Sequence, residues 1–339
     1  MSVAPSLLPA GLEDQLPPWA ETEAQELSQI LETARTFGYD RVKPPLLEYE
    51  ETLTAFAPDS LRKGFKLADP QAEGLLVVRS DKTGQVIRIA QTRLKDEPRP
   101  LRLSYGGQIL RAKGSQLRPE RQFTQAGVEL IGVPQGAESQ ALIEIIDLCM
   151  TALESAGVTN VTVDLTLPQV ARDAAKADPV LIQALNERNA ALAETVGDAA
   201  RDVVKLIGAF GPWRGAVAVM DEVELGKDVR ALETVAQAVE TRHPATEVLV
   251  DPAELRGFDY HTGLAFVLYA KGIRGELGRG GLYQAGDEQA AGFTLYMDSV
   301  MRALPARAIP TKTQVSVDAD PQDVARRRAA GEIIVADLA

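Results

Sequence analysis

A helix-patterned stretch in the middle of the chain, with strand-patterned segments on both sides, most constrains the fold. Residues 170–245 are rich in Ala, Glu, Arg and Leu at helical spacing, with breaks at Pro179, Gly197, Gly211 and Gly226. The flanking segments have the short alternating pattern of strands, and they do not alternate with helices as βαβ units would. The sequence therefore predicts an α+β fold in which a helical insertion interrupts a sheet.

The strand-patterned and helix-patterned segments can be placed along the chain. Strands are expected at Leu75–Arg79, 102–112, Gln122–Gly132, Val161–Leu165, Glu247–Asp251, Gly263–Tyr269 and Gly275–Tyr283. Helices are expected at residues 20–37, Val86–Arg93, Glu138–Ala156 and Gly292–Leu304. For residues 102–112, two strands or one strand with a bulge at Gly106-Gly107 fit equally. We expect a core of residues 1–310 with the insertion at about 166–246, then a short C-terminal segment, 311–339.

Composition and charge exclude several classes of protein. Hydrophobic residues make up 45% and charged residues 25% of the 339 residues, which is ordinary for a globular protein. There is no apolar run of membrane-spanning length and no signal-peptide pattern, so we expect a cytoplasmic protein without a membrane partner. Cys149 is the single cysteine, which excludes an internal disulfide. The net charge of −12 disfavours a nucleic-acid partner.

Several catalytic motifs are absent. The chain has no GxxxxGK[ST], and its glycine-rich GELGRGGLYQAG does not fit GxGxxG. His243 and His261 are the only histidines, so HExxH is impossible, and no GxSxG elbow is present. The sequence therefore predicts no metal and no cofactor.

Three polar islands interrupt the strand-patterned segments. They are RSDKT (79–83), the segment 109–129, and ELRGFDYHTG (254–263) with the downstream RGGLY (279–283). Polar side chains are costly to bury without partners, so these islands are candidates to line a ligand cleft.

Each island also has a purely structural explanation. Asp81 and Thr83 fit the start of a helix, where short polar side chains cap backbone N–H groups. Arg111 fits a surface strand position, and Arg256 with Asp259 fits an ion pair at a turn. Taken alone, no island distinguishes a binding site from these alternatives.

Taken together, the islands resemble the catalytic core of the histidyl-tRNA synthetases. RLSYGGQILR with RQFTQAGVE resembles class II motif 2, and RGFDYHTGLAF with GELGRGGLY resembles the histidine-specific signature. LLPAGLEDQLPPW resembles the opening segment of the family. The resemblance spans residues 5–305 and implies a class II aminoacyl-tRNA synthetase-like antiparallel sheet flanked by helices.

The resemblance also implies a histidine-binding site. The carboxylates would bind ammonium and imidazole N–H groups, and an arginine would bind the substrate carboxylate. The residues at the matching positions are Asp81, Thr83, Arg111, Gln125, Glu129, Arg256, Tyr260 and His261. Asp81 stands where the family has glutamate, and His261 stands where it has a second tyrosine.

The departures from the family pattern lie on the side that would bind ATP. Lys113 stands in place of an acid, Pro119 in place of an arginine and Tyr296 in place of a glycine. Ser299 stands where an arginine should clamp the ATP phosphates, and Arg302 lies one helical turn further on. Each lost charge of this kind costs on the order of 10²–10³ in rate, so we expect no catalytic residues and no aminoacylation.

This combination resembles the synthetase-like regulatory subunits of short-form ATP phosphoribosyltransferase. The short C-terminal segment, in place of an anticodon-binding domain, agrees with the expectation of no tRNA partner. The resemblance implies a catalytic phosphoribosyltransferase partner, L-histidine as an inhibitory effector, and a homodimer through the class II core near residues 39–57. The alternatives are a compact histidyl-tRNA synthetase or histidine-activating ligase, and a histidine-sensing module that acts on another partner.

Overall fold

The chain divides into two compact units, Met1–Leu304 and Pro305–Ala339. The computed structural model describes residues 7–56, 63–71, 73–115, 118–221, 226–258, 260–305 and 311–338. Within these residues, no helix has both the length and the apolar character that crossing a membrane requires.

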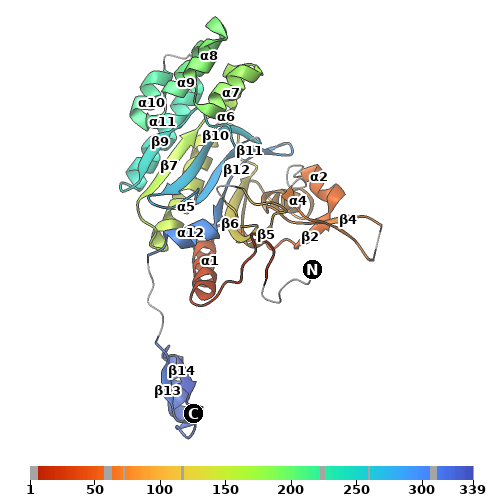
Figure 1. Cartoon of the computed structure of the whole chain (residues 1–339), viewed down its shortest axis with the longest axis vertical. Helices are drawn as coiled ribbons and strands as arrows, with labels where there is room; N and C mark the ends of the chain where they lie inside the picture. Colours follow the sequence, from red (N-terminus) through yellow and green to blue (C-terminus); the bar gives the residue numbers. More distant parts are fainter. Residues whose placement is uncertain are drawn as a thin grey trace. The chain divides into compact units, whose positions relative to one another are not determined.

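A nine-stranded sheet forms the centre of the larger unit, as far as the described residues extend (Figure 1). In chain order its strands are β1 (Asp40–Arg41), β5 (Leu101–Leu110), β6 (Gln122–Ile131), β7 (Val161–Thr166), β8 (Gly211–Pro212), β9 (Glu247–Val250), β10 (His261–Ala270), β11 (Gly278–Ala285) and β12 (Glu288–Tyr296). Their order across the sheet is β1-β5-β6-β12-β11-β10-β7-β9-β8. Neighbours are antiparallel except β1 with β5 and β7 with β9, so the predicted antiparallel sheet is confirmed in its central strands.

The two faces of the central strand β6 have different neighbours. Ala126, Val128 and Leu130 point into the hydrophobic core with α1 (Trp19–Thr36) and α5 (Glu138–Ser155). Because side chains alternate along a strand, Gln125, Gly127 and Glu129 point to the opposite face. That face is also buried, so β6 is covered on both sides and carries its polar residues into the interior.

A second, three-stranded sheet lies beside this polar face. It has the order β2-β4-β3, with β2 (Leu47–Tyr49), β3 (Lys66–Ala68) and β4 (Leu75–Val78). The helices α2 (Glu50–Phe56) and α4 (Thr83–Thr92) accompany it. Glu48 of β2 is buried and accepts hydrogen bonds from Arg88 and Gln85 of α4, at 2.6 and 2.9 Å. This buried ion pair holds the start of α4 in place over the main sheet.

The segment between β7 and β9 is helical, as its sequence pattern predicts. It contains α6 (Pro168–Ala175), α7 (Pro179–Glu187), α8 (Ala190–Glu194), η1 (Gly197–Ala200), α9 (Arg201–Gly208), α10 (Trp213–Met220) and α11 (Gly226–Arg242). Asp178 begins α7 by accepting hydrogen bonds from the N–H groups of Val180 and Leu181. Figure 1 shows these helices grouped at the β7–β9 side of the sheet.

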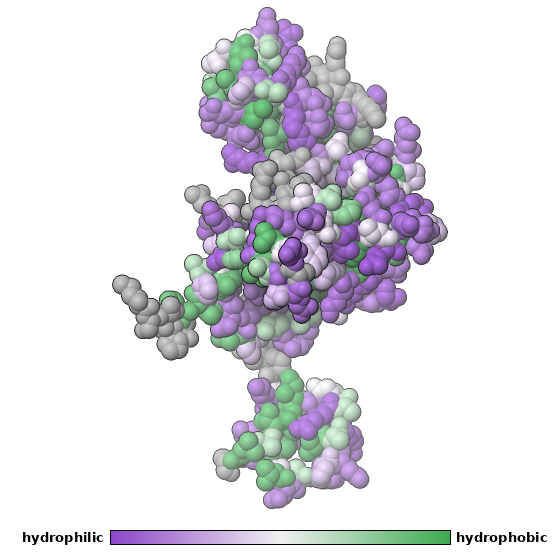
Figure 2. Space-filling model, turned by 90° about the vertical axis from the view of Figure 1, so that its right-hand side faces the viewer, coloured by the Kyte–Doolittle hydropathy of each residue, from purple (hydrophilic) through white to green (hydrophobic). Residues whose placement is uncertain are grey.

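The C-terminal unit is a small strand-helix-strand motif. Its strands β13 (Thr313–Val315) and β14 (Ile334–Ala336) pair in parallel, and α13 (Pro321–Ala329) connects them. No described side chain of α13 is buried, so its arginines form a solvated helix face. Val317 and Leu338 are 66% and 89% exposed, and Figure 2 shows apolar side chains on the surface of this unit.

Two of the predicted elements are wrong. The expected helix Gly292–Leu304 begins only at α12 (Met297–Ala303), because the preceding residues complete strand β12 between β6 and β11. Neither alternative for residues 102–112, two strands or one strand with a bulge, is observed, since β5 is a single strand that stays in register with β6 from Leu101 to Leu110. Gly106 instead leaves room for α1: a Cβ atom there would lie 2.8 Å from the Leu27 side chain.

The close approach of β6 to β12 generates a prediction about Gly127. A Cβ atom on Gly127 would lie 2.3 Å from the Phe293 carbonyl oxygen and 2.6 Å from the Tyr105 hydroxyl. We expect Gly127→Ala to lower the free energy of unfolding by about 1–3 kcal/mol through overpacking, measured by urea denaturation. The control is Gly215→Ala in α10, where a Cβ atom has no neighbour within 4 Å and alanine favours the helix. Equal stability of the two variants would contradict this account of β6.

Candidate functional site

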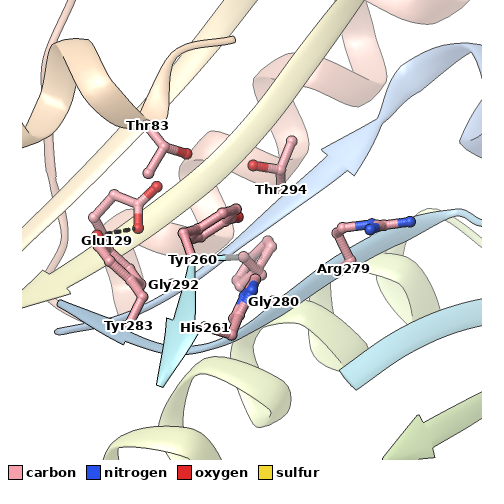
Figure 3. A pocket seen from close by; sticks show the side chains of 10 residues that line it. Thr83, Glu129, Tyr260, His261, Arg279, Gly280, Tyr283, Gly292 and Thr294 are labelled. Atoms are coloured by element: carbon pink, nitrogen blue, oxygen red, sulfur yellow. Dashed lines mark hydrogen bonds between the residues drawn. The ribbon is translucent and has the colours of Figure 1, made fainter. Parts of the chain in front are cut away.

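The polar face of the main sheet contains a small pocket (Figure 3). Strands β6, β11 and β12 form its floor, and the start of α4 and the entry to β10 form its walls. It is lined by Thr83, Glu129, Tyr260, His261, Arg279, Gly280, Tyr283, Gly292, Phe293 and Thr294. Figure 3 shows Glu129 and Tyr283 at one end, Arg279 at the other, and Tyr260 between them.

Glycines in the floor leave the space that the polar side chains occupy. A Cβ atom on Gly292 would lie 1.9 Å from the Glu129 carboxylate, and one on Gly280 would lie 2.3 Å from the Gly292 carbonyl oxygen. Any larger residue at either position would displace Glu129 or the neighbouring strand. The pocket therefore requires glycine at both of these floor positions.

Glu129 is the buried centre of the pocket's hydrogen-bond network. The Tyr283 hydroxyl donates to its Oε2 at 2.7 Å, and the Tyr105 hydroxyl donates to its Oε1 at 3.1 Å. Tyr105 also lies 2.8 Å from the Thr294 hydroxyl. Burial raises the pKa of Glu129 to about 8, against the opposing effect of these hydrogen bonds. The carboxyl group is therefore mostly protonated at neutral pH.

The sequence-predicted residues Asp81, Thr83 and Gln125 meet at the start of α4. Asp81 Oδ2 accepts a hydrogen bond from Gln125 Nε2 at 2.8 Å, and Asp81 Oδ1 accepts one from the Thr83 backbone N–H at 2.9 Å. Asp81 therefore bonds the first backbone N–H of α4 from the residue before the N-cap, Lys82, which itself gives no side-chain cap. Gln125 is fully buried, and its Oε1 has no hydrogen-bond partner among the described residues.

Tyr260 and His261 also line the pocket, and they lie against each other. Their ring centroids are 4.2 Å apart, and Tyr260 meets Tyr283 edge to face at 6.0 Å. Burial and the charges of Arg279 and Arg172 lower the pKa of His261 to about 3, so its imidazole is neutral.

Two of the predicted binding residues lie elsewhere. Arg256 does not line the pocket: its guanidinium donates to the Asn186 carbonyl oxygen of the insertion at 2.7 Å. Arg111 lies beside Phe123, with its guanidinium carbon 5.0 Å from the ring centroid. Asp259, the expected ion-pair partner of Arg256, lies outside the described residues. Of the eight residues predicted to bind histidine, six lie in the pocket or next to it, and Arg111 and Arg256 lie outside.

Arg279 and Tyr283 line the pocket and belong to the RGGLY segment of the third polar island, although the sequence predicted no binding role for either residue. Arg279 hydrogen-bonds the Glu276 carboxylate and donates to the Gly257 carbonyl oxygen at 2.9 Å, so it fixes the loop that precedes β10. The sequence does mark Arg279 as unusual, because a charged residue inside the glycine-rich GELGRGGLY is uncommon in a strand. Tyr283 and the Glu129 partner Tyr105 were given no role, since tyrosine is common in ordinary strands.

The region that departs from the synthetase pattern has an internal charge network of its own. Arg118 is buried, with its guanidinium carbon 3.8 Å from the Tyr296 ring centroid. It pairs with Asp298 at 3.3 Å and donates to the Ser299 hydroxyl at 3.1 Å. Arg302 pairs with Asp298 at 3.3 Å and donates to the same serine hydroxyl at 3.1 Å. Both arginines are thus engaged by the protein itself.

Comparisons with known proteins agree with this fold, which defines a class II histidyl-tRNA synthetase-like protein. The family model described as histidyl-tRNA synthetase matches residues 11–300. A solved histidyl-tRNA synthetase from Nostoc sp. PCC 7120 superposes with a TM-score of 0.79 at 16% identity, covering 99% of this chain and 87% of that chain. A Bacillus halodurans C structure described as ATP phosphoribosyltransferase regulatory subunit/histidyl-tRNA synthetase gives 0.82 at 26% identity, covering 99% and 93%.

Sequence relatives narrow the class to one family. The ATP phosphoribosyltransferase regulatory subunit of Rhodospirillum centenum is 44% identical over 92% of this chain and 84% of its own length. The protein of the same name from Gluconobacter oxydans is 37% identical over 98% and 90%. The chain belongs to the family of ATP phosphoribosyltransferase regulatory subunits, and the resemblance inferred from the polar islands is confirmed.

The buried Arg118 generates a stability prediction. Arg118→Ala would leave Asp298 buried with one cationic partner fewer, and we expect it to lower the free energy of unfolding by about 3 kcal/mol. The matched control is Arg256→Ala, where an exposed guanidinium contacts a backbone carbonyl and the expected loss is below about 1 kcal/mol. Denaturant titrations of both variants measure the difference. A larger loss for Arg256→Ala would overturn the assignment.

The raised pKa of Glu129 generates a pH prediction. Between the ordinary glutamate pKa near 4.5 and about 8, the folded chain holds a proton that the unfolded chain releases, so stability falls as pH rises. We expect Glu129→Gln to remove this contribution, which makes the decline in stability from pH 5 to 8 shallower by up to ~1.4 kcal/mol per pH unit. Asp164, another buried acid with a pKa of about 7, contributes equally to both proteins and cancels. Parallel pH profiles would exclude the raised pKa.

Proposed function

We propose that this chain is the non-catalytic regulatory subunit of a short-form ATP phosphoribosyltransferase, required for the first step of histidine biosynthesis in the cytoplasm. Membership of the regulatory-subunit family supports the role. The observation that carries it is the contrast between the two sides of the site. The Glu129 pocket is intact, whereas Arg118 and Arg302, at the nucleotide side, are paired internally with Asp298.

The proposal assigns L-histidine to the Glu129 pocket as the feedback inhibitor. Glu129 and Tyr283 at one end can exchange hydrogen bonds with an imidazole, while Asp81 and the unpartnered oxygen of Gln125 can accept from an ammonium group. Binding inhibits if histidine has a higher affinity for the inactive state of the complex than for the active one. Histidine binding can thus change the activity of the catalytic partner without any catalysis by this chain.

We further propose a homodimer through the class II core, at the stretch near residues 39–57. Leu46, Leu47 and Tyr49 are 53%, 37% and 44% exposed, and Leu67 of the adjacent β3 is 46% exposed. Apolar side chains gathered on one small sheet are typical of an interface between subunits. The proposal includes no tRNA partner, since the net charge of −12 opposes binding to a phosphate backbone.

Reconstitution with a catalytic phosphoribosyltransferase chain tests the proposal. We expect the catalytic chain to be active only with this chain present, and L-histidine to inhibit the complex. Tyr283→Phe removes a hydrogen bond to Glu129, so it should leave the complex active and raise the half-inhibitory histidine concentration about tenfold. Tyr269→Phe, at a strand tyrosine outside the pocket lining, is the matched control and should not change inhibition.

Two outcomes would replace the proposal. Robust histidine-dependent ATP–pyrophosphate exchange by the purified chain would identify a compact synthetase or a histidine-activating ligase. Histidine binding without any effect on a catalytic phosphoribosyltransferase would identify a histidine-sensing module for another partner, which affinity purification from the host would then reveal.

A further inference from the structure

The segment that leads into α1, residues 7–19, exposes large apolar side chains, and we call it the α1 entry segment. Leu7, Leu8, Leu16 and Trp19 are 65%, 45%, 65% and 55% exposed. Single apolar residues on a surface are ordinary, whereas several on one short segment are typical of a surface that binds another molecule. Trp19, the first residue of α1, adds to this argument, because tryptophan is enriched among the residues that contribute most to protein–protein binding.

Hydrogen bonds hold the backbone of the α1 entry segment in place. The Arg121 backbone N–H donates to the Gly11 carbonyl oxygen at 2.8 Å, and the Arg121 guanidinium donates to the Ala10 carbonyl oxygen at 3.0 Å. At the other end of the segment, the Trp19 backbone N–H donates to the Leu16 carbonyl oxygen at 2.9 Å. The backbone that carries the exposed side chains is therefore ordered before a partner arrives, which lowers the entropic cost of binding.

The charge of this region has one sign. Residues 7–34 include six acidic residues and neither lysine nor arginine. Glu13, Asp14 and Glu21 are exposed and lie within or just after the α1 entry segment. Arg121, which bonds the segment, adds one positive charge, so the surface stays negative. The α1 entry segment therefore combines exposed apolar side chains with an acidic rim.

The acidic rim disfavours several possible occupants of this surface. Twofold pairing of two copies would place the segment against itself, so that acidic residues face acidic residues. Nucleic acids and membrane surfaces are also negative, and the same charges repel them. The occupant that fits is a protein surface with an apolar pocket and a surrounding rim of lysine and arginine, because its shape and charge both complement the segment.

We propose that the α1 entry segment is the surface on which the catalytic phosphoribosyltransferase chain docks, with Trp19 seated in an apolar pocket that lysine and arginine surround. The inference rests on the proposed function and names the surface on which its hetero-complex forms. A chain that joins both a second copy and a catalytic chain requires two separate surfaces. The homodimer is proposed at Leu46, Leu47 and Tyr49 of the small sheet, which leaves the α1 entry segment for the catalytic chain.

Binding of the full chain to the purified catalytic chain of the same host, measured by biolayer interferometry, tests the role of Trp19. We expect Trp19→Ala to weaken binding about 30-fold, since it removes the largest apolar contact of the segment. Phe210→Ala is the matched control and should bind as the wild type does, because Phe210 is an aromatic residue of the insertion with 59% exposure. Equal affinities of Trp19→Ala and the wild type would overturn the docking surface.

Reversal of the acidic charges tests the rim. We expect the triple variant Glu13→Lys, Asp14→Lys, Glu21→Lys to lower the association rate constant at least about tenfold at low salt, and added salt should narrow the difference. The matched control makes the same change in net charge with lysine at three exposed acidic residues of the insertion: Glu187, Glu194 and Asp198. An equal loss of rate in both triple variants would show that net charge, and not this segment, determines association, and would overturn the proposal.

Two further measurements separate docking from folding and from contact between copies. The melting temperature of Trp19→Ala should match that of the wild type, because more than half of the side chain is exposed. Light scattering should give the same mass for both proteins, and a lower mass for Trp19→Ala would assign the segment to the contact between copies and overturn the proposal.

The outcomes also separate this inference from the proposed function. A wild-type chain that neither binds nor activates the catalytic chain would overturn the proposed function together with this inference. A wild-type chain that activates the catalytic chain, with equal activation by Trp19→Ala at limiting concentration, would overturn the docking surface and leave the proposed function standing.

Discussion

The hydrogen bonds from Tyr283 and Tyr105 to the buried carboxyl group of Glu129 are the interaction on which the pocket depends. A carboxyl group in the interior of a sheet is tolerated only when its oxygens are bonded, and these two hydroxyls bond one oxygen each. Tyr105 lies on β5 and Tyr283 lies on β11, and these strands are on opposite sides of β6. Their hydrogen bonds to Glu129 therefore link three strands of the sheet. The glycines of the floor supply the space in which this network fits.

The Glu129 pocket and the Arg118 charge network lie on different parts of the fold. Sheet strands carry the Glu129 pocket, and their hydrogen-bonded register fixes its geometry. The region that departs from the synthetase pattern is built from Arg118, which follows β5, and the start of α12. Arg118 and Arg302 both pair with Asp298 there, which gives these charged groups a structural role.

The sequence allowed the architecture and much of the pocket to be predicted. Asp81, Thr83 and Glu129 were found because polar residues stood out in strand-patterned segments and matched a known family. Arg256 was misplaced because the Asn186 carbonyl oxygen that it contacts belongs to the insertion, which local pattern cannot position. The local sequence pattern predicts a helix for the end of β12, because the pairing of β12 with β6 is a long-range contact that the spacing of neighbouring residues does not reveal.

The glycine floor also sets the order in which such a site can change over generations. Glycine has no smaller replacement, so any mutation of Gly280 or Gly292 adds atoms where the Glu129 network stands. Mutations in the β5–β6 connection alter charge and leave that volume untouched. A protein of this kind can therefore change the charges of its loop while the Glu129 pocket keeps its shape.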